Sequence, residues 1–235
     1  MNLPKYWGVH AAVFFAVLII FMSCENYSAI SKNALDHNPD FTLFQDSLAS
    51  MVARDQAVQF AHTEGQSARV RDSLYRAKDS IFRVQSDIVK EMFDRHGFLD
   101  TTMVGSKGSY NFWLLVQHAD HDPDFQRRVL EAMAPLVKEG LADASNYAYL
   151  TDRVRKNAGE KILYGTQVSY TDDFWVIPLP LEDSLHVNER RAAVGLDPIE
   201  AYLNSMMELH FRMNEKVYRE RGMDGPNQYS LREEK

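Results

Sequence analysis

The sequence is poor in cysteine, proline, glycine and positive charge, and each shortage excludes a class of protein. Among 235 residues there are one cysteine, eight prolines and eleven glycines, which excludes an internal disulfide and a collagen-like or low-complexity body. Basic residues number 26 against 33 acidic ones, and the net charge of −7 argues against a general nucleic-acid binder. The chain is instead 45% hydrophobic, with thirteen phenylalanines and eleven tyrosines, which predicts a folded globular domain.

The N-terminus carries a hydrophobic run that is too short to span a membrane. Residues 11–22 form an unbroken apolar run of twelve, whereas a spanning helix needs about 20. Lys5 is the only charged residue before Cys24, and Ser23 ends the run, a pattern typical of an export signal. We therefore predict that residues 1–23 are a signal peptide.

Cys24 stands where a lipoprotein signal peptidase would cut. The segment Phe21-Met22-Ser23-Cys24 resembles a lipobox. A free thiol without an intramolecular partner would otherwise be unusual in an oxidising compartment. We predict that Cys24 is lipidated and attaches the exported chain to the inner or outer membrane of the cell envelope. An uncleaved signal anchor, and an ordinary signal peptide with a chance cysteine, are the alternatives.

The mature chain divides by composition into three parts. Residues 24–40 are polar and lack helical periodicity, which favours a tether. Residues 41–220 carry the apolar periodicity expected of a single helical domain. Residues 221–235 are polar again, and we expect a flexible tail.

The first half of that domain shows two helical patterns. Apolar residues recur at helical spacing over 41–58, and again at alternating spacings of four and three over 70–92. The second pattern is a heptad seam. It includes an alanine and is short, so a long amphipathic helix ending at Gly97 is favoured over a coiled coil. Over 104–109 we expect a turn, with Ser109 capping a short helix after it.

Capping signals and composition predict the remaining elements. Asp122 and Pro123 open a helix that Gly140 closes, and another runs over 143–157 to Gly159. Residues 162–179 are rich in Tyr, Val, Thr, Phe and Trp, a composition that predicts a β-hairpin. Two more helices are expected, over 187–194 and from an Asp197 cap to residue 217. The predicted fold class is therefore mainly α (α+β), with one small antiparallel β-hairpin.

Four short motifs lie in order in the C-terminal half: QHAD at 117–120, YAYLTDRV at 147–154, YGTQ at 164–167 and VNERRAAVGL at 187–196. Together, within about residues 93–204, they resemble an uncharacterised bacterial domain family of unknown function. Members usually have Trp-Pro where this chain has Phe98-Leu99. The resemblance implies no activity.

The segment around QHAD concentrates groups that could carry chemistry. Residues 117–122 hold two imidazoles and two carboxylates, which suggests an acid/base pair or a metal site. Asp122 is better explained as a helix cap before Pro123, so we expect neither a metal site nor a cofactor. His118 lies on the apolar side of its helix, which favours a hydrogen-bonded core histidine. The functional alternative is a general base that Asp120 orients, if the helix ends at Ala119.

A second candidate group surrounds Asp152. On a helical wheel Asp152 lies opposite the apolar stripe of Tyr147, Leu150 and Val154, so we expect it to face solvent or a cleft. In the simpler interpretation it pairs with a nearby arginine on a solvated surface. In the functional interpretation the arginines converge on an anionic ligand beside the YGTQ strand, where Gly165 allows close approach. The ligand-binding residues would then be Gln117, Arg153, Tyr164, Gln167, Arg190 and Arg191.

Two functions of different classes fit these residues. The favoured one is a lipid-anchored envelope domain that binds a partner protein or a small anionic ligand without turnover, because no nucleophile, metal set or cofactor motif is recognisable. The alternative is a hydrolase-like or transferase-like enzyme in which His118 is the general base. In that enzyme Asp120 or Asp152 would orient His118, and Arg190 or Arg191 would hold an anionic substrate.

Overall fold

The computed structural model describes residues 39–59 and 66–231 and confirms a mainly α fold with one small antiparallel hairpin. Contacts divide the chain into two compact units. Their described parts are residues 39–59 with 66–160, here the helical unit, and residues 161–231, here the hairpin unit. The predicted domain spans both units. The predicted signal peptide, Cys24 and the tether up to residue 38 lie outside the described residues.

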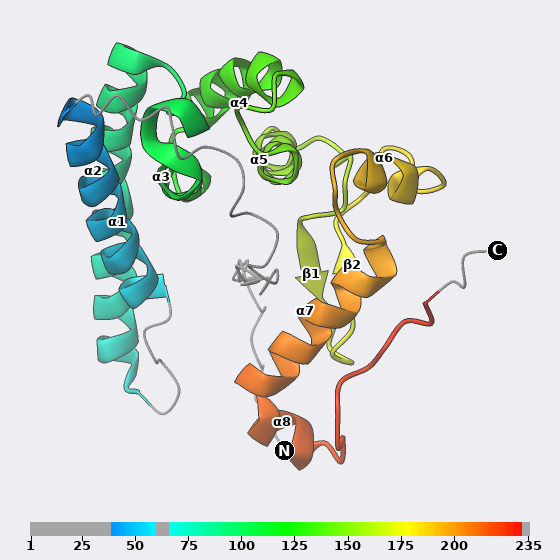
Figure 1. Cartoon of the computed structure of the whole chain (residues 1–235). Coiled ribbons are helices and arrows are strands. Elements are labelled where there is room, and N and C mark those ends of the chain that lie inside the picture. Colours follow the sequence, from blue (N-terminus) through cyan, green and yellow to red (C-terminus); the bar gives the residue numbers. More distant parts are fainter. Residues whose placement is uncertain (1–38, 60–65, 232–235) are drawn as a thin grey trace. The chain divides into compact units, whose positions relative to one another are not determined.

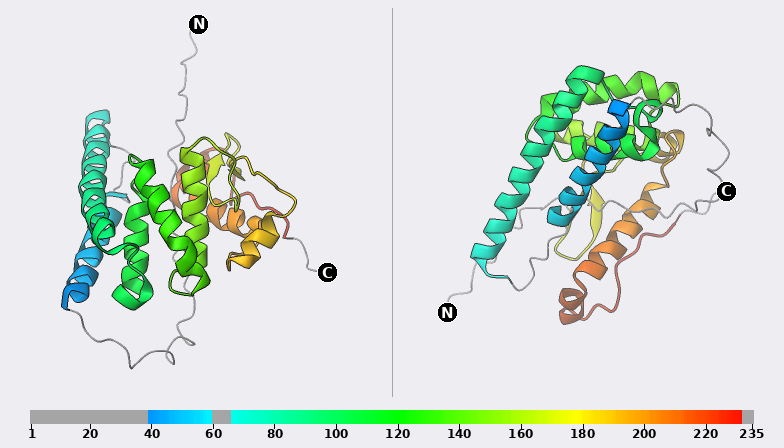
Figure 2. Two further views of the ribbon diagram at one scale, coloured as in Figure 1. Left: turned by 90° about the horizontal axis from the view of Figure 1, so that it is seen from above. Right: turned by 60° about the vertical axis from the view of Figure 1, so that its left-hand side comes forward.

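The helical unit contains five helices (Figure 1): α1 (Pro39–Gln59), α2 (Ala68–His96), α3 (Thr101–Gln117), α4 (Pro123–Lys138) and α5 (Ala144–Asn157). Helix α1 packs against α2 and α3, and α4 packs against α5. Figure 2 shows α1 lying along α2. The core between them is apolar and includes Leu48, Met51, Val89, Phe112, Phe125 and Val129. None of the helices in the described part of the chain is long and apolar enough to cross a membrane.

Several helix ends follow the predicted capping signals. The Asp122 carboxylate accepts a hydrogen bond from the Phe125 backbone N–H at 3.0 Å, and Pro123 is the first helical residue. Asp143 caps α5 in the same way, and Gly97 ends α2 with a φ of 74°. These ends were predictable because a cap is a local interaction over three or four residues.

Removal of the Asp122 cap should destabilise the fold. We expect Asp122→Ala to lower the free energy of unfolding by about 0.5–2 kcal/mol, because the first turn of α4 loses its side-chain acceptor. Asp122→Asn is the matched control, since it keeps an acceptor oxygen and loses only the ion pair with Lys90. Urea denaturation measures both variants. An Asn variant as unstable as the Ala variant would mean that the ion pair, not the cap, stabilises this end.

The prediction of a turn over 104–109 was wrong. Asp100 begins α3 earlier, because its carboxylate accepts hydrogen bonds from the backbone N–H groups of Thr102 and Met103. The chain bends at Gly105, where φ is 66°, and continues as helix to Gln117. Ser109 therefore lies buried inside the helix and does not cap it.

The hairpin unit places three helices with a two-stranded sheet. Strand β1 (Val168–Tyr170) pairs antiparallel with β2 (Val176–Pro178), so that Ser169 lies opposite Ile177. Helices α6 (Val187–Ala193), α7 (Ile199–Met213) and α8 (Glu215–Glu220) follow, and α7 packs against β2, α6 and α8.

The start of α7 differs from the predicted Asp197 cap. Pro198 occupies the cap position, and its side chain makes no capping hydrogen bond. Instead, the Asn188 side chain, ten residues back along the chain from Pro198, accepts a hydrogen bond from the Ile199 N–H at 2.7 Å. Its amide also donates to Glu200 at 3.0 Å. Asn188 thus ties α6 to the start of α7, an interaction between two helices that local capping rules do not detect.

The segment predicted as a flexible tail makes specific contacts up to residue 231. The Tyr229 hydroxyl donates to the Val176 carbonyl at 2.9 Å, and the Tyr229 ring packs against Trp175. Its backbone exchanges two hydrogen bonds with the side chain of Asn204. This aromatic residue therefore anchors the segment to α7 and β2.

Candidate functional site

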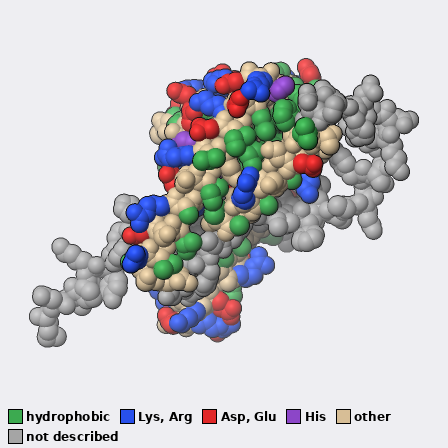
Figure 3. Space-filling view, turned by 90° about the vertical axis from the view of Figure 1, so that its left-hand side faces the viewer, with side chains coloured by type: hydrophobic (Ala, Val, Ile, Leu, Met, Phe, Trp, Pro, Cys, Tyr) green, Lys and Arg blue, Asp and Glu red, His purple; other side chains and the backbone are tan. Residues whose placement is uncertain are grey.

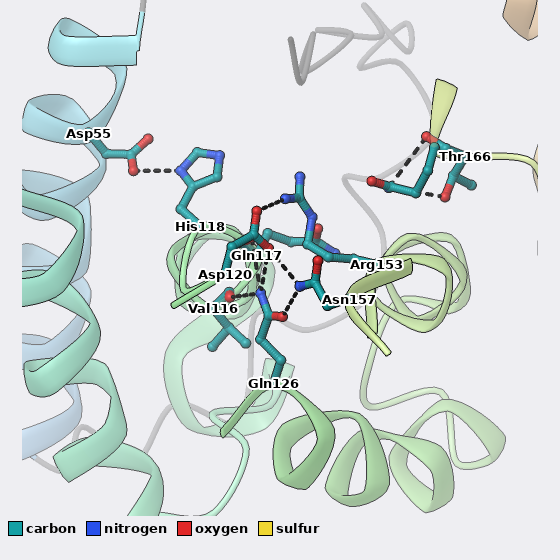
Figure 4. Close-up of polar contacts among 10 residues, drawn as sticks. Asp55, Val116, Gln117, His118, Asp120, Gln126, Arg153, Asn157 and Thr166 are labelled. Carbon is teal, nitrogen blue, oxygen red and sulfur yellow. Dashed lines mark hydrogen bonds and ion pairs between the residues drawn. The ribbon is translucent and has the colours of Figure 1, made fainter. Parts of the chain in front are cut away.

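His118 is held between three helices of the helical unit. It follows the last residue of α3, and its Nδ1 lies 2.6 Å from the Asp55 carboxylate of α1. Its ring stacks on Phe82 of α2 at 4.8 Å between centroids, with an angle of 14° between the ring planes. Figure 4 shows the His118 ring and the Asp55 carboxylate pointing toward each other. Because Asp55 is fully buried and His118 is only 8% exposed, the ring has a fixed orientation.

The other ring nitrogen of His118 makes no hydrogen bond within the described part of the chain. Nε2 is buried, and so is the side-chain amide of the neighbouring Gln117, whose oxygen and nitrogen also have no partner there. A buried polar atom without a partner destabilises a fold by about 1–3 kcal/mol, so such atoms are uncommon. Two adjacent residues with this property at the end of α3 mark the place where a ligand could supply the missing hydrogen bonds.

Asp120 belongs to a different network from His118. Its carboxylate pairs with Arg153 of α5 at 2.5 Å and accepts a hydrogen bond from Asn157 at 2.9 Å (Figure 4). Gln126 of α4 donates to Asp120 at 3.3 Å and to the Val116 carbonyl at 3.1 Å. The expectation that Asp120 orients His118 was therefore wrong. Arg153 and the two amides hold Asp120, and Asp55 holds His118.

The pKa of Asp120 reflects this network. Burial alone would raise it, but the charge of Arg153 and the hydrogen bonds from Asn157 and Gln126 outweigh burial and lower the pKa below its usual range. Asp120 is thus held as a carboxylate and does not serve as a proton donor near neutral pH.

Two lysines lie within electrostatic range of the same groups. Partial burial lowers the pKa of Lys78, with opposing contributions from the Asp55 and Asp120 carboxylates and a further lowering from the positive charge of Arg153. Burial and then Arg153 also lower the pKa of Lys156. The Lys78 ammonium lies 5.4 Å from the centroid of the Phe82 ring that stacks on His118. Three cations thus share this region with two carboxylates.

The predicted exposure of Asp152 was wrong. Asp152 has no exposed surface, and its neighbours Leu150, Thr151 and Arg153 are buried too. Four successive residues cannot lie on one stripe of a helix, so this part of α5 is covered on all sides. The helical wheel failed because it assumed a helix with a single buried face.

Arg190 and Arg191 of the hairpin unit both donate to backbone carbonyls. Arg190 donates to the Leu163 carbonyl at 2.9 Å. Arg191, only 1% exposed, donates to the Tyr164 carbonyl at 2.6 Å and stacks over Tyr202. These bonds connect the YGTQ and VNERRAAVGL motifs and give both arginines a structural role. The buried Gln167 amide lies 3.5 Å from Thr166, and the Gln167 oxygen has no partner within the described residues. A site that combines Asp152 with Arg190 would involve both units and stays a prediction.

Four residues of this region were not predicted from the sequence: Asp55, Lys78, Gln126 and Asn157. Asp55 carried a detectable signal, because it lies four residues after Met51 and seven after Leu48, on the apolar stripe of α1. A carboxylate at a core position needs a buried partner. Within the residues that the structure describes, no group of three or more His, Cys, Asp or Glu side chains is placed to hold a metal ion.

The protein is mainly helical, and two buried or half-buried pairs hold its motifs in place. Asp55 pairs with His118, and Asp120 of the QHAD motif pairs with Arg153 of the YAYLTDRV motif. The sequence pattern of the Family of unknown function (DUF6624) matches residues 39–215, three quarters of the chain. The chain belongs to this family. Neither the curated proteins nor the solved structures gave a match to the chain.

Proposed function

We propose that the protein is a lipid-anchored protein of the bacterial cell envelope and that its helical unit binds a small anionic ligand beside His118 without turning it over. The anchor rests on the sequence alone, on the apolar run before Cys24 and on that residue being the only cysteine. We favour a small ligand, one that carries a carboxylate or phosphate group, over a partner protein. His118 is only 8% exposed, so too little of its side chain is accessible for a protein surface to contact it.

One observation carries the ligand proposal. Asp55 and Phe82 fix the His118 ring from two sides, while Nε2 has no partner within the described residues. Asp55 accepts from Nδ1–H, so Nε2 is the acceptor in the neutral ring and a second donor in the protonated ring. A protonated phosphate or carboxylic acid group can donate to Nε2, and an ionised one can accept from it.

The surrounding charges favour an anion. Lys78, Arg153 and Lys156 outnumber the carboxylates of Asp55 and Asp120. Both lysine pKa values are lowered, first by burial and then, in part, by the repulsion from Arg153. A bound anion would offset that repulsion and stabilise the charged lysines.

Inorganic phosphate is a suitable probe for this site. We expect phosphate, added at constant ionic strength and compared with chloride, to raise the unfolding temperature of the wild-type protein, because a ligand that binds only the folded state stabilises it. Lys78→Met should reduce that rise, since it removes a cation and keeps most of the side-chain volume. The matched control is Lys107→Met on the exposed surface of α3. An equal rise in all three proteins would contradict binding at this site.

The Asp55–His118 pair also favours a second candidate function, a hydrolase-like or transferase-like enzyme. An imidazole whose Nδ1 is held by a carboxylate and whose Nε2 has no partner within the described residues is the arrangement of a general base. In this candidate Asp55 takes the orienting role that sequence analysis gave to Asp120 or Asp152. Nitrophenyl phosphate and nitrophenyl acetate serve as probes. The enzyme candidate predicts turnover that His118→Gln lowers by about 10²–10⁴, whereas the binding proposal predicts no turnover above that of the variant.

A further inference from the structure

Helix α2 has a second apolar face, on which Val70, Val84 and Ile88 are exposed and Leu74 and Ile81 are half-buried. The face follows the heptad seam up to Ile88, whose residues alternate in spacing of four and three: Val70, Leu74, Ala77, Ile81, Val84 and Ile88. Met92, the last residue of the seam, is buried in the core of the helical unit and is not part of this face. The residues that α2 buries against its own unit are others, among them Gln85, Val89 and Phe93. At 100° per residue, the seam lies roughly 100° around the helix from this buried face.

The seam is exposed along most of its length. Val84 is 58% exposed, Val70 41% and Ile88 37%. Residues 70–88 span about 27 Å of helix, and Figure 3 shows hydrophobic side chains gathered in a band on the face formed by α1 and α2. A continuous apolar stripe of this kind, framed by charged residues, marks an interaction surface.

We propose that this seam binds the same seam of a second copy of the chain, with the two α2 helices antiparallel. The spacing itself argues for a second helix with the same pattern. Apolar residues that recur in alternating steps of four and three form one continuous seam, and such a seam is matched by a partner helix with the same heptad spacing. The seam is also symmetric about residue 79. Val70 would therefore lie opposite Ile88 of the second copy, and Ala77 opposite Ile81, a small residue against a large one.

The charges beside the seam select the antiparallel direction. Arg69 lies at the N-terminal end of the seam and Asp87 at its C-terminal end, on the same outer edge. Both are exposed, and neither has an ion pair within the described residues. In an antiparallel pair the edge that carries Arg69 and Asp87 faces the same edge of the second copy, so Arg69 lies near Asp87 of the second copy twice. In a parallel pair these two edges lie on opposite sides of the interface, and the charge pair does not form. Ser73 and Ser80, both exposed, lie between them and allow close approach of the helices.

Disulfide cross-linking of the full chain in its membrane tests this pairing. Ser80 lies next to the proposed twofold axis, so Ser80→Cys should give a dimer of the chain when an oxidant is added. Two controls should stay monomeric. One is the wild type, which has only Cys24, and the other is Asp72→Cys, whose position lies on the other side of α2. A yield for Ser80→Cys no higher than for Asp72→Cys, or cross-linking to other proteins only, would overturn the proposal.

Two further changes in the Ser80→Cys background separate pairing from chance collision. Val84→Lys should reduce the dimer to the level of the controls, whereas Tyr75→Lys, at a position of similar exposure (56%) off the seam, should not. Arg69→Glu should reduce the dimer as well, and adding Asp87→Arg should restore it, because the charge pair is then reversed. Failure of the double variant to regain dimer would overturn the antiparallel arrangement. These results are independent of ligand binding at His118.

Discussion

Replacement of Cys24 by alanine is expected to abolish the incorporation of labelled palmitate and to move the chain from the membrane fraction to the soluble fraction if the signal is still cut. The expected effect is complete, because the chain has no other cysteine on which a lipid could be placed. Lipid attachment supplies the membrane affinity, about 0.8 kcal/mol for each buried CH₂ group. The measurement is gel fluorography of the labelled chain together with fractionation of the cells.

Ser28→Ala provides the matched control for this experiment, since it changes a residue of the predicted tether without touching the predicted cleavage site. It should keep both the label and the membrane location. Undiminished labelling of the Cys24→Ala variant would rule out lipidation at Cys24. Loss of label with unchanged membrane location would mean that Cys24 carries the lipid and that the variant keeps its signal peptide, whereas absence of label on the wild type would support the alternative of an uncleaved signal anchor.

Replacement of Arg153 by methionine is expected to destabilise the helical unit by about 2–3 kcal/mol, slightly less than the breaking of a fully buried ion pair. The Arg153 side chain is 4% exposed, whereas the side chain of its partner Asp120 is 44% exposed. In the variant, the Asp120 carboxylate loses its partner but keeps part of its hydration. Asp120→Asn is the companion variant, and the double variant completes a cycle. Its destabilisation should be smaller than the sum of the two single changes, because the two groups satisfy each other.

The Arg153 effect should depend on pH in a defined direction. The folded-state pKa of Asp120 is lowered, so the ionised carboxylate stabilises the folded chain above the unfolded-state value near 3.8. That stabilisation is lost as the pH falls through the lower folded-state pKa. The difference in unfolding free energy between wild type and Arg153→Met should therefore be constant near neutral pH and shrink below about pH 4. A difference that does not change with pH would mean that Arg153 acts mainly through packing.

The elements of the fold that could be predicted from the sequence are those with local signals. Asp122 and Pro123 at the start of α4 and Gly97 at the end of α2 act on residues within one helical turn. The error at α3 arose from choosing Ser109 over Asp100 as the cap, two residues with similar capping strength. The Asn188 contact with Ile199 was beyond sequence analysis because it joins two helices.

The candidate site was predictable only in part, because its contacts join distant segments. His118 was identified as a residue with a buried partner, but Asp55 lies 63 residues earlier in the chain, and periodicity gives no pairing over such a separation. Arg153 was predicted only as a ligand-binding residue, and the structure pairs it with the Asp120 carboxylate. Asp152 was misplaced because α5 is buried on more than one side.

The central claim, that an anion binds beside His118, is tested most directly by the ring nitrogen signals of ¹⁵N-labelled histidine in the intact protein. Phosphate is added at constant pH and ionic strength, and His118→Gln assigns the signals among the eight histidines. The proposal predicts a saturable change of the His118 Nε2 signal, a smaller change at Nδ1 because Asp55 keeps its hydrogen bond, and weaker saturation in Lys78→Met. A His118 Nε2 signal that does not respond to phosphate, while the protein stays folded, would contradict it.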